Sequence, residues 1–276
     1  MGQFLLVFRE TLEAALITTV TLTYLIRTGR KQLTRHVWYG VGFASVASFS
    51  SGAFVWLLYG GFSGLVKALF EGVAALLAVF VLSSMIYWMA TKGRRIKMEI
   101  EEQVEDLAER GAAYALTSFS FVVVFREGLE TVLFLAPFLV TDFGGTFIGT
   151  LVGFVASLVF SWAVFILGVK INMQRFFLFT SLLLVLLAGG LAGYGVHELL
   201  EYSDGIGVEV GWLAEKAYVL DVPEDSPFHH KGFVGSVLAV MFGYTVAPEW
   251  GRLVVHFTYL ILTLPLVTSV YRKRNA

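Results

Sequence analysis

FLLVFRETLEAALITTVTLTYLI, residues 4–26, and FVVVFREGLETVLFLAPFLV, residues 121–140, each place three charged residues inside an apolar run. Both runs are long enough to cross a bilayer as a helix. An ionisable residue within a membrane span costs about 2.5–3.5 kcal/mol on insertion scales, so such residues mostly mark a functional site. The charged motif R-E-x-x-E, present at Arg9–Glu13 and again at Arg126–Glu130, therefore predicts a site built from both copies.

The composition indicates a membrane protein. Hydrophobic residues make up 57% of the 276 residues, charged residues make up 15%, and the mean hydropathy is +0.76. Soluble domains are more polar than this. The net charge is −1 and there is no basic block, which argues against a nucleic-acid partner because phosphate contacts need clustered Lys and Arg. The chain has no Cys, so a metal site is expected to use oxygen and imidazole ligands.

Apolar runs separated by charged or Gly-rich breaks predict an all-α, polytopic fold with seven transmembrane helices. The expected spans are 3–26, 37–58, 65–91, 112–140, 144–169, 176–200 and 251–271. A shorter apolar run at 232–248 is interpreted as a re-entrant or interfacial helix on the outer face. The first span is expected to stay in the mature protein, because the charged motif interrupts what would be a signal-peptide core.

The distribution of Lys and Arg predicts the orientation in the cell membrane. Most of the 20 basic residues follow the first, third, fifth and seventh expected spans. They are Arg27, Arg30, Lys31, Arg35, Lys92, Arg94, Arg95, Lys97, Arg110, Lys170, Arg175, Arg272, Lys273 and Arg274. By the positive-inside rule, the N-terminus is then outside and the C-terminus is cytoplasmic.

Expected helices 1–3 and 4–6 resemble two copies of one unit, because each set begins with the charged motif. The middle helix of each set carries small residues at every fourth position, which lets helix backbones approach closely in lipid. These residues are Gly40, Ala44, Ser48 and Gly52, and then Gly145, Gly149, Gly153, Ser157 and Ser161. Since three is odd, the second copy runs opposite to the first. Such an inverted 3+3 repeat is common in secondary transporters, whose substrate site lies near the midplane.

This interpretation divides the single transmembrane domain, residues 1–276, into segments. Repeat one is 1–91, a charged cytoplasmic loop is 92–111, repeat two is 112–200, an outer segment with the short helix is 201–250, and the last helix with a basic tail is 251–276.

The chemistry of the two motifs points to a cation. Glutamates three apart share a helix face, so each motif presents two carboxylates side by side. They are Glu10, Glu13, Glu127 and Glu130. Arg9 and Arg126 each precede the second glutamate by four residues and can offset one carboxylate. Four carboxylates in one small volume cannot all stay ionised without a cation, and oxygen ligands suit a hard multivalent ion. A structural Arg–Glu network is the alternative, but it leaves one glutamate of each pair unexplained.

With R-E-x-x-E in the first and fourth expected spans and Phe242-Gly243-Tyr244 before the last, the whole chain resembles the oxidase-dependent iron transporters. The resemblance implies an iron permease that imports Fe³⁺ or Fe²⁺, with iron as substrate and no catalytic residues or cofactor. It implies iron ligation by Glu10, Glu13, Glu127 and Glu130, supported by Arg9 and Arg126. Members of that family work with a ferroxidase or an extracytoplasmic iron-binding protein, so either is a candidate partner, besides membrane lipid.

Further acidic and imidazole groups are candidates for the path or an outer entrance. Glu71 lies near the outer end of the third expected span, where it either lines the path or pairs with Lys67. His197, Glu198 and Glu201 end the sixth span, and His197 and Glu201 have the i, i+4 spacing that a metal can use. A solvated helix end is the alternative for these three residues.

Two polar segments remain. The acidic outer segment, which also contains His229 and His230, is expected to be a solvated loop whose charge attracts cations. The loop 92–111 is expected to form a charged helix in water, with iron hand-off as the weaker alternative.

Other functions stay open at this point. The same carboxylates could carry another divalent cation such as Mn²⁺ or Pb²⁺. A membrane-embedded di-iron oxidase is less favoured, because such centres use Glu-x-x-His pairs and neither motif has a His at that position. A structural subunit whose charges only lock helices together is the last alternative.

Overall fold

The computed structural model describes residues 2–92, 96–109, 113–141, 143–165, 173–229 and 232–273. Apart from one isolated bridge between Lys216 and Glu249, the regular elements in these ranges are helices. The α-helices are α1 (Gly2–Arg27), α2 (Thr34–Gly60), α3 (Gly64–Lys92), α4 (Ile96–Glu109), α5 (Ala113–Thr141), α6 (Phe143–Phe165), α7 (Met173–Gly205), α8 (Phe233–Phe242) and α9 (Trp250–Lys273). Two short 3₁₀ turns, η1 (Lys31–Leu33) and η2 (Gly211–Ala214), complete the set.

The protein is an all-α, polytopic membrane protein. Within the described residues, five helices are long and apolar enough to cross a membrane, namely α2, α3, α6, α7 and α9. The other two long helices, α1 and α5, each carry the three charged residues of one motif. Each of the seven expected spans coincides with one long helix, although residue 112 of the fourth and residues 166–169 of the fifth lie outside the described part. That all seven cross the membrane stays a prediction.

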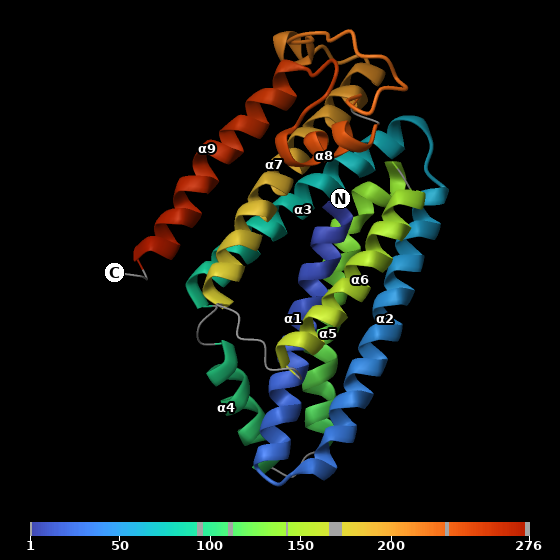
Figure 1. Cartoon of the computed structure of the whole chain (residues 1–276). Helices are drawn as coiled ribbons and strands as arrows, with labels where there is room; N and C mark the ends of the chain where they lie inside the picture. The colour runs from blue at the N-terminus through green and yellow to red at the C-terminus, as the bar shows by residue number, and fades with distance from the viewer. Residues whose placement is uncertain are drawn as a thin grey trace.

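The long helices form two groups (Figure 1). In the first group, α1, α2, α5 and α6 run nearly upright, with α2 packed along α5 and α6 packed along α1. In the second group, α3, α7 and α9 are tilted, with α7 packed against both α3 and α9. The two helices that carry the charged motifs, α1 and α5, pack against each other. This contact brings the two motifs together in the interior.

The small-residue stripes lie at the closest helix contacts, as the sequence predicted. A Cβ atom at Gly40 of α2 would press on the Thr117 carbonyl of α5 and lie 2.7 Å from the Ser120 Cβ. A Cβ atom at Gly153 of α6 would lie 2.7 Å from the Phe4 carbonyl oxygen of α1. Only glycine fits where backbones approach this closely, so these residues set how near α1 and α5 lie to their neighbours.

Two apolar cores hold the groups together. The larger core joins α3, α5, α7 and α9 with the start of α1, and it includes Leu82, Phe134 and Leu187. The smaller core lies where Ile100 and Val104 of α4 pack against the ends of α1, α2 and α5. The segment 92–111 therefore contains the expected helix, but that helix buries one apolar face instead of being solvated all round.

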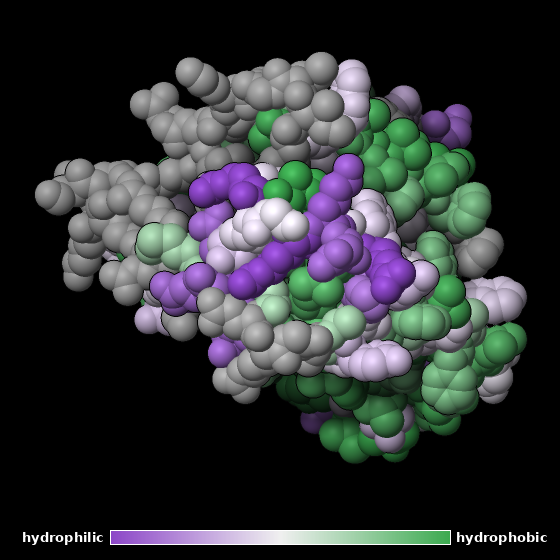
Figure 2. Space-filling view, turned by 90° about the horizontal axis from the view of Figure 1, so that it is seen from below, coloured by the Kyte–Doolittle hydropathy of each residue, from purple (hydrophilic) through white to green (hydrophobic). Residues whose placement is uncertain are grey.

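The end of the bundle that carries α4 is polar, and the sides are apolar. Seen from that end, hydrophilic residues gather near the middle while hydrophobic residues line much of the edge (Figure 2). The long apolar side chains that α2 and α6 expose, such as Phe49, Phe54, Phe147 and Val159, match a surface in lipid.

At the opposite end, the segment after α7 forms a mostly irregular cap with η2 and the short helix α8 (Figure 1). The ten residues of α8 are too few to cross a bilayer, in agreement with the expected short helix. The helix stops at Gly243, which has φ of 66° in the left-handed region. His229 in the cap is buried, and His230 lies outside the described residues.

Candidate functional site

Three of the four motif glutamates converge. Carboxylate oxygens of Glu10, Glu127 and Glu130 all lie within 4.8 Å of one another. Glu10 is 1% exposed and Glu127 is 5% exposed. We call these residues the three-glutamate site; it joins α1 to α5 in the interior of the bundle.

The three-glutamate site has spare ligand atoms. Glu10, Glu127 and Glu130 each have a buried Oε2 atom that finds no hydrogen-bond partner among the residues that the structure describes. An ionised oxygen buried in this way carries a desolvation cost of several kcal/mol unless a proton or a cation compensates it. A proton or a cation at the three-glutamate site would offset this cost.

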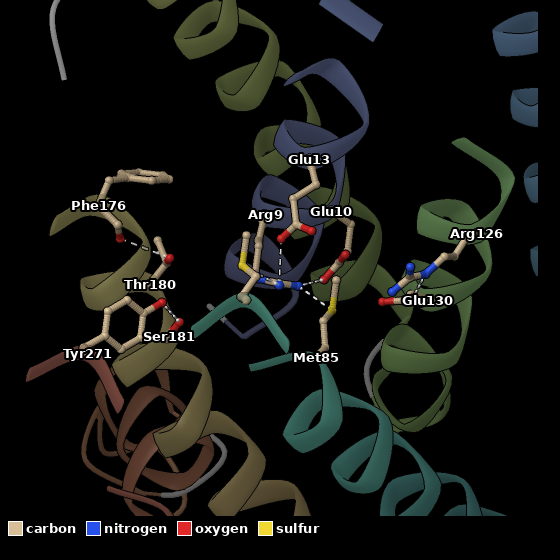
Figure 3. A network of polar contacts seen from close by, with 11 residues as sticks. Arg9, Glu10, Glu13, Met85, Arg126, Glu130, Phe176, Thr180, Ser181 and Tyr271 are labelled. Carbon is tan, nitrogen blue, oxygen red and sulfur yellow. Dashed lines mark hydrogen bonds and ion pairs between the residues drawn. The ribbon is translucent and has the colours of Figure 1, made fainter. Parts of the chain in front are cut away.

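Arg9 holds the other side of the first motif (Figure 3). One guanidinium nitrogen donates a hydrogen bond to Glu10 Oε1 at 2.6 Å, and the other forms an ion pair with Glu13 Oε1 at 2.7 Å. The pair with Glu13 was expected from the spacing of four, whereas the bond to Glu10 was not. Glu13 does not belong to the three-glutamate site, because it is not among the carboxylates that converge within 4.8 Å.

Two methionines of α3 complete the surroundings of Arg9. The nitrogen that bonds Glu10 also lies 2.8 Å from the Met85 sulfur (Figure 3). The nitrogen that pairs with Glu13 lies 3.2 Å from the Met89 sulfur. The sequence interpretation missed both residues. Their i, i+4 spacing on one apolar helix was the available signal, but ordinary core packing gives the same pattern.

The second motif is arranged differently. Arg126 Nε donates a hydrogen bond to Glu130 Oε1 at 2.8 Å, as the spacing predicted, and the guanidinium lies over the Trp88 ring, 5.8 Å from its centre. The Arg126 side chain is 53% exposed, whereas that of Arg9 is buried. The two copies of the motif therefore differ in how firmly their arginine is enclosed.

A cavity of about 600 Å³ borders the three-glutamate site. It lies among α1, α2, α5 and α6, and its wall includes Glu10 and Glu127. Most of the remaining wall is apolar, with hydroxyl groups from residues such as Thr11, Ser48 and Thr131. The carboxylates thus meet open space on one side and Arg9 on the other.

Glu71 is the centre of a separate network between α2, α3 and α7. Its carboxylate accepts hydrogen bonds from Tyr59 at 2.5 Å and from Tyr194, and Lys67 Nζ lies 3.8 Å away. The expected Lys67–Glu71 pair is present, whereas the two tyrosines were missed because they lie on other helices. The network ties α2, α3 and α7 together.

The end of α7 contains the other expected cluster. His197, Glu198 and Glu201 each offer a ligand atom, and these atoms lie within 4.8 Å of one another. His197 Nδ1 is also 3.1 Å from Glu249 Oε2, just before α9, and donates to it because a carboxylate only accepts. Burial acts to raise the pKa of Glu249, but the hydrogen bond and charge of His197 outweigh burial, so the pKa lies below its usual value.

Comparisons with known proteins cover nearly the whole chain. The model of the iron permease FTR1 family matches residues 1–270. A protein of Archaeoglobus fulgidus, described as uncharacterized, is 41% identical over 273 residues, which is 99% of this chain and 96% of that protein. The ferrous iron permease EfeU of Yersinia pestis is 35% identical over 266 residues, covering 95% of this chain and 91% of EfeU. EfeU of Escherichia coli O6:H1 is 32% identical over 264 residues, covering 95% and 92%. No solved structure matches.

Proposed function

The chain belongs to the iron permease FTR1 family and is a transporter rather than an enzyme, and from this premise we propose that it imports Fe²⁺ or Fe³⁺ through the glutamates of its two charged motifs. The observation that carries this proposal is the three-glutamate site, in which each glutamate has one buried oxygen without a hydrogen-bond partner among the residues that the structure describes. Glu13, held by Arg9, is the fourth proposed ligand. Mn²⁺ or Pb²⁺ would suit the same oxygens and remains the alternative cargo.

Charge supports a cation as cargo. The two motifs bring four carboxylates and two guanidinium groups together, and each guanidinium already pairs within its own helix. Carboxylates in excess of arginines would repel one another in a medium of low dielectric constant. A bound iron ion would relieve that repulsion, and protons would do so when the site is empty.

The proposed inverted repeat is supported by the helix pairing. If α1–α3 and α5–α7 are related by a two-fold axis, the contact of α2 with α5 must recur as a contact of α6 with α1. Both contacts are present, and both use a small-residue stripe. Two further contacts between the units, α1 with α5 and α3 with α7, join helices that would be equivalent, and α9, which lies outside both units, packs on α7. We propose that the two units rock about the three-glutamate site to give alternating access.

The proposed path enters from the end of the bundle that carries the acidic cap. With seven spans and the N-terminus outside, Glu71 and the cluster of His197, Glu198 and Glu201 would lie towards the outer face of the cell membrane. Their carboxylates would gather cations before the deeper site. A ferroxidase or an iron-binding protein is the proposed source of iron at this face.

The decisive experiment is iron uptake into proteoliposomes that contain the purified chain, under ferrous and under ferric conditions. Glu127→Gln and Glu130→Gln keep side-chain shape and remove the charge, and both are expected to abolish uptake while the protein elutes as the wild type does. Glu209→Gln, at an exposed position of the cap, is the matched control and is expected to transport normally. Normal uptake by Glu127→Gln would show that the proposed site is wrong.

A further inference from the structure

The guanidinium of Arg9 is surrounded by atoms that also serve as metal ligands. Its two terminal nitrogens contact two carboxylate oxygens, from Glu10 and Glu13, and two thioether sulfurs, from Met85 and Met89. Figure 3 shows Glu10, Glu13 and Met85 directed towards the Arg9 guanidinium. A fixed cation thus occupies a set of two oxygen and two sulfur donors.

We propose that this oxygen–sulfur set binds the transported iron when Arg9 withdraws, and that Met85 and Met89 make the permease selective for Fe²⁺ over harder ions such as Mg²⁺ and Fe³⁺. The inference rests on the proposed iron transport and adds to it the oxidation state of the cargo. In the protein without iron, the Arg9 guanidinium occupies the position that the metal ion would take.

The donor chemistry supports this assignment. A thioether sulfur is only a weak hydrogen-bond acceptor, so it is a poor partner for a guanidinium N–H. It is a good ligand for soft and borderline metal ions, whereas carboxylates suit hard ions. A mixed set therefore favours a borderline divalent ion such as Fe²⁺. Leucine would fill the same apolar space as methionine, so packing alone does not call for two sulfurs at this place.

The sulfurs are held at the site by the fold. Met85 is 4% exposed and Met89 is 3% exposed, and Met85 is part of the larger apolar core together with Leu82 and Ile86. One turn of α3 separates the two methionines, so both face α1. Both thioethers are therefore buried and in contact with the Arg9 guanidinium.

The second motif shows an arginine placed away from the first glutamate of its motif. Among the described residues, Arg126 forms an ion pair with Glu130 and stacks on Trp88, while Glu127 belongs to the three-glutamate site. An equivalent placement of Arg9 would keep its pair with Glu13 but release Glu10, whose Oε1 atom would become available beside the Met85 sulfur; withdrawal from Glu13 as well would open the full oxygen–sulfur set. Metal could then pass between the three-glutamate site and the oxygen–sulfur set without leaving the interior.

The first test is spectroscopic and does not depend on transport. The purified full-length protein is loaded with Fe²⁺ under anaerobic conditions, and X-ray absorption at the iron edge is recorded for the wild type and for the double variant Met85→Leu/Met89→Leu. Met241→Leu, on α8 and outside the site, is the matched control. We expect a shell of sulfur scatterers in the wild type and in the control, and its loss in the double variant.

The second test measures selectivity. The ratio of Fe²⁺ to Mg²⁺ uptake in proteoliposomes is expected to fall about tenfold or more in the double variant, the size of effect typical when a group that supports a metal is removed. A wild-type spectrum with only oxygen and nitrogen scatterers, or an unchanged uptake ratio in a double variant that transports normally, would overturn the inference. If the double variant does not fold, the single variants Met85→Leu and Met89→Leu, together with the wild-type spectrum, test the inference. Absent uptake by a wild type with a sulfur shell would refute the proposed function and leave this site standing.

Discussion

The carboxylates of Glu10 on α1 and Glu127 on α5 lie within 4.8 Å of each other in the buried centre of the bundle. Two like charges this close repel each other, and the interior offers little water to screen them. Each residue also carries an oxygen without a hydrogen-bond partner among the described residues. The contact of α1 with α5 is therefore most favourable when a cation or a proton lies between the two carboxylates.

The motif glutamates are expected to differ in importance for uptake. Glu10→Gln and Glu127→Gln remove oxygens of the three-glutamate site and are expected to lower iron uptake on the order of 100-fold or more, since even supporting groups of metal sites are worth about 10–100-fold in affinity. Glu13→Gln, whose carboxylate faces Arg9, is expected to have a smaller effect. Initial uptake rates of the three variants in proteoliposomes give the order, and an equal loss in all three would contradict it.

The two motif arginines are expected to contribute unequally to stability. Arg9→Gln leaves two buried carboxylates without their cation, and breaking a buried pair of this kind typically costs about 3–5 kcal/mol. Arg126→Gln breaks a pair whose arginine is half-exposed, and such pairs are worth about 0.2–1 kcal/mol. Thermal unfolding in detergent is expected to show a clearly lower midpoint for Arg9→Gln than for Arg126→Gln. Matching midpoints would show that Arg9 is less enclosed than described.

The contact between α2 and α5 is expected to tolerate no side chain at Gly40. Gly40→Ala places a Cβ atom against the α5 backbone and is expected to destabilise the protein by about 1–3 kcal/mol, as overpacking does. Gly42→Ala, half a turn away with nothing within 4 Å, is the matched control. It is expected to be neutral or to stabilise by about 0.5–1 kcal/mol, because Ala favours the helix. Thermal unfolding of the two variants tests both expectations. Similar unfolding midpoints would contradict the close packing of α2 on α5 at Gly40.

Tyr194 and Glu71 are expected to be energetically coupled. Hydrogen bonds to charged groups contribute about 1.5–3 kcal/mol, so a double-mutant cycle with Tyr194→Phe and Glu71→Gln is expected to give a coupling energy of that order. Tyr202→Phe, two turns further along α7, serves as the control and is expected to show no coupling to Glu71→Gln. Additive effects in the Tyr194 cycle would remove Glu71 from its proposed role in tying α3 to α7.

The His197–Glu249 pair is expected to make stability depend on pH in the acid range. Because the folded-state pKa of Glu249 lies below its ordinary value of 4.5, the pair contributes stability that is fully present above 4.5 and is lost as the pH falls through the folded value. Thermal midpoints of the wild type and Glu249→Gln are therefore expected to differ at neutral pH and to converge in acid. Glu209→Gln controls for general acid effects, and a gap that persists at low pH would contradict the assignment.

The duplicated R-E-x-x-E motif predicted the protein family, and the comparisons with known proteins confirmed that prediction. The helices were predictable for the same reason, because an apolar run of this length has few options in lipid. The i, i+4 pairs Arg9–Glu13, Lys67–Glu71 and Arg126–Glu130 were also predictable, since both partners lie on one helix. The buried face of α4 was not, because its partners come from three other helices.

What the sequence determined by itself is therefore local: which segments are helices, which charges share a helix face, and that the charged motif occurs twice. The tertiary structure alone decided that Glu10, Glu127 and Glu130 converge while Glu13 faces Arg9, and that Met85 and Met89 close around that arginine. Helical periodicity fixes relationships within about two turns. Contacts between helices depend on the rotation of each helix about its axis, and the packing of glycine stripes and apolar cores across the whole bundle sets that rotation.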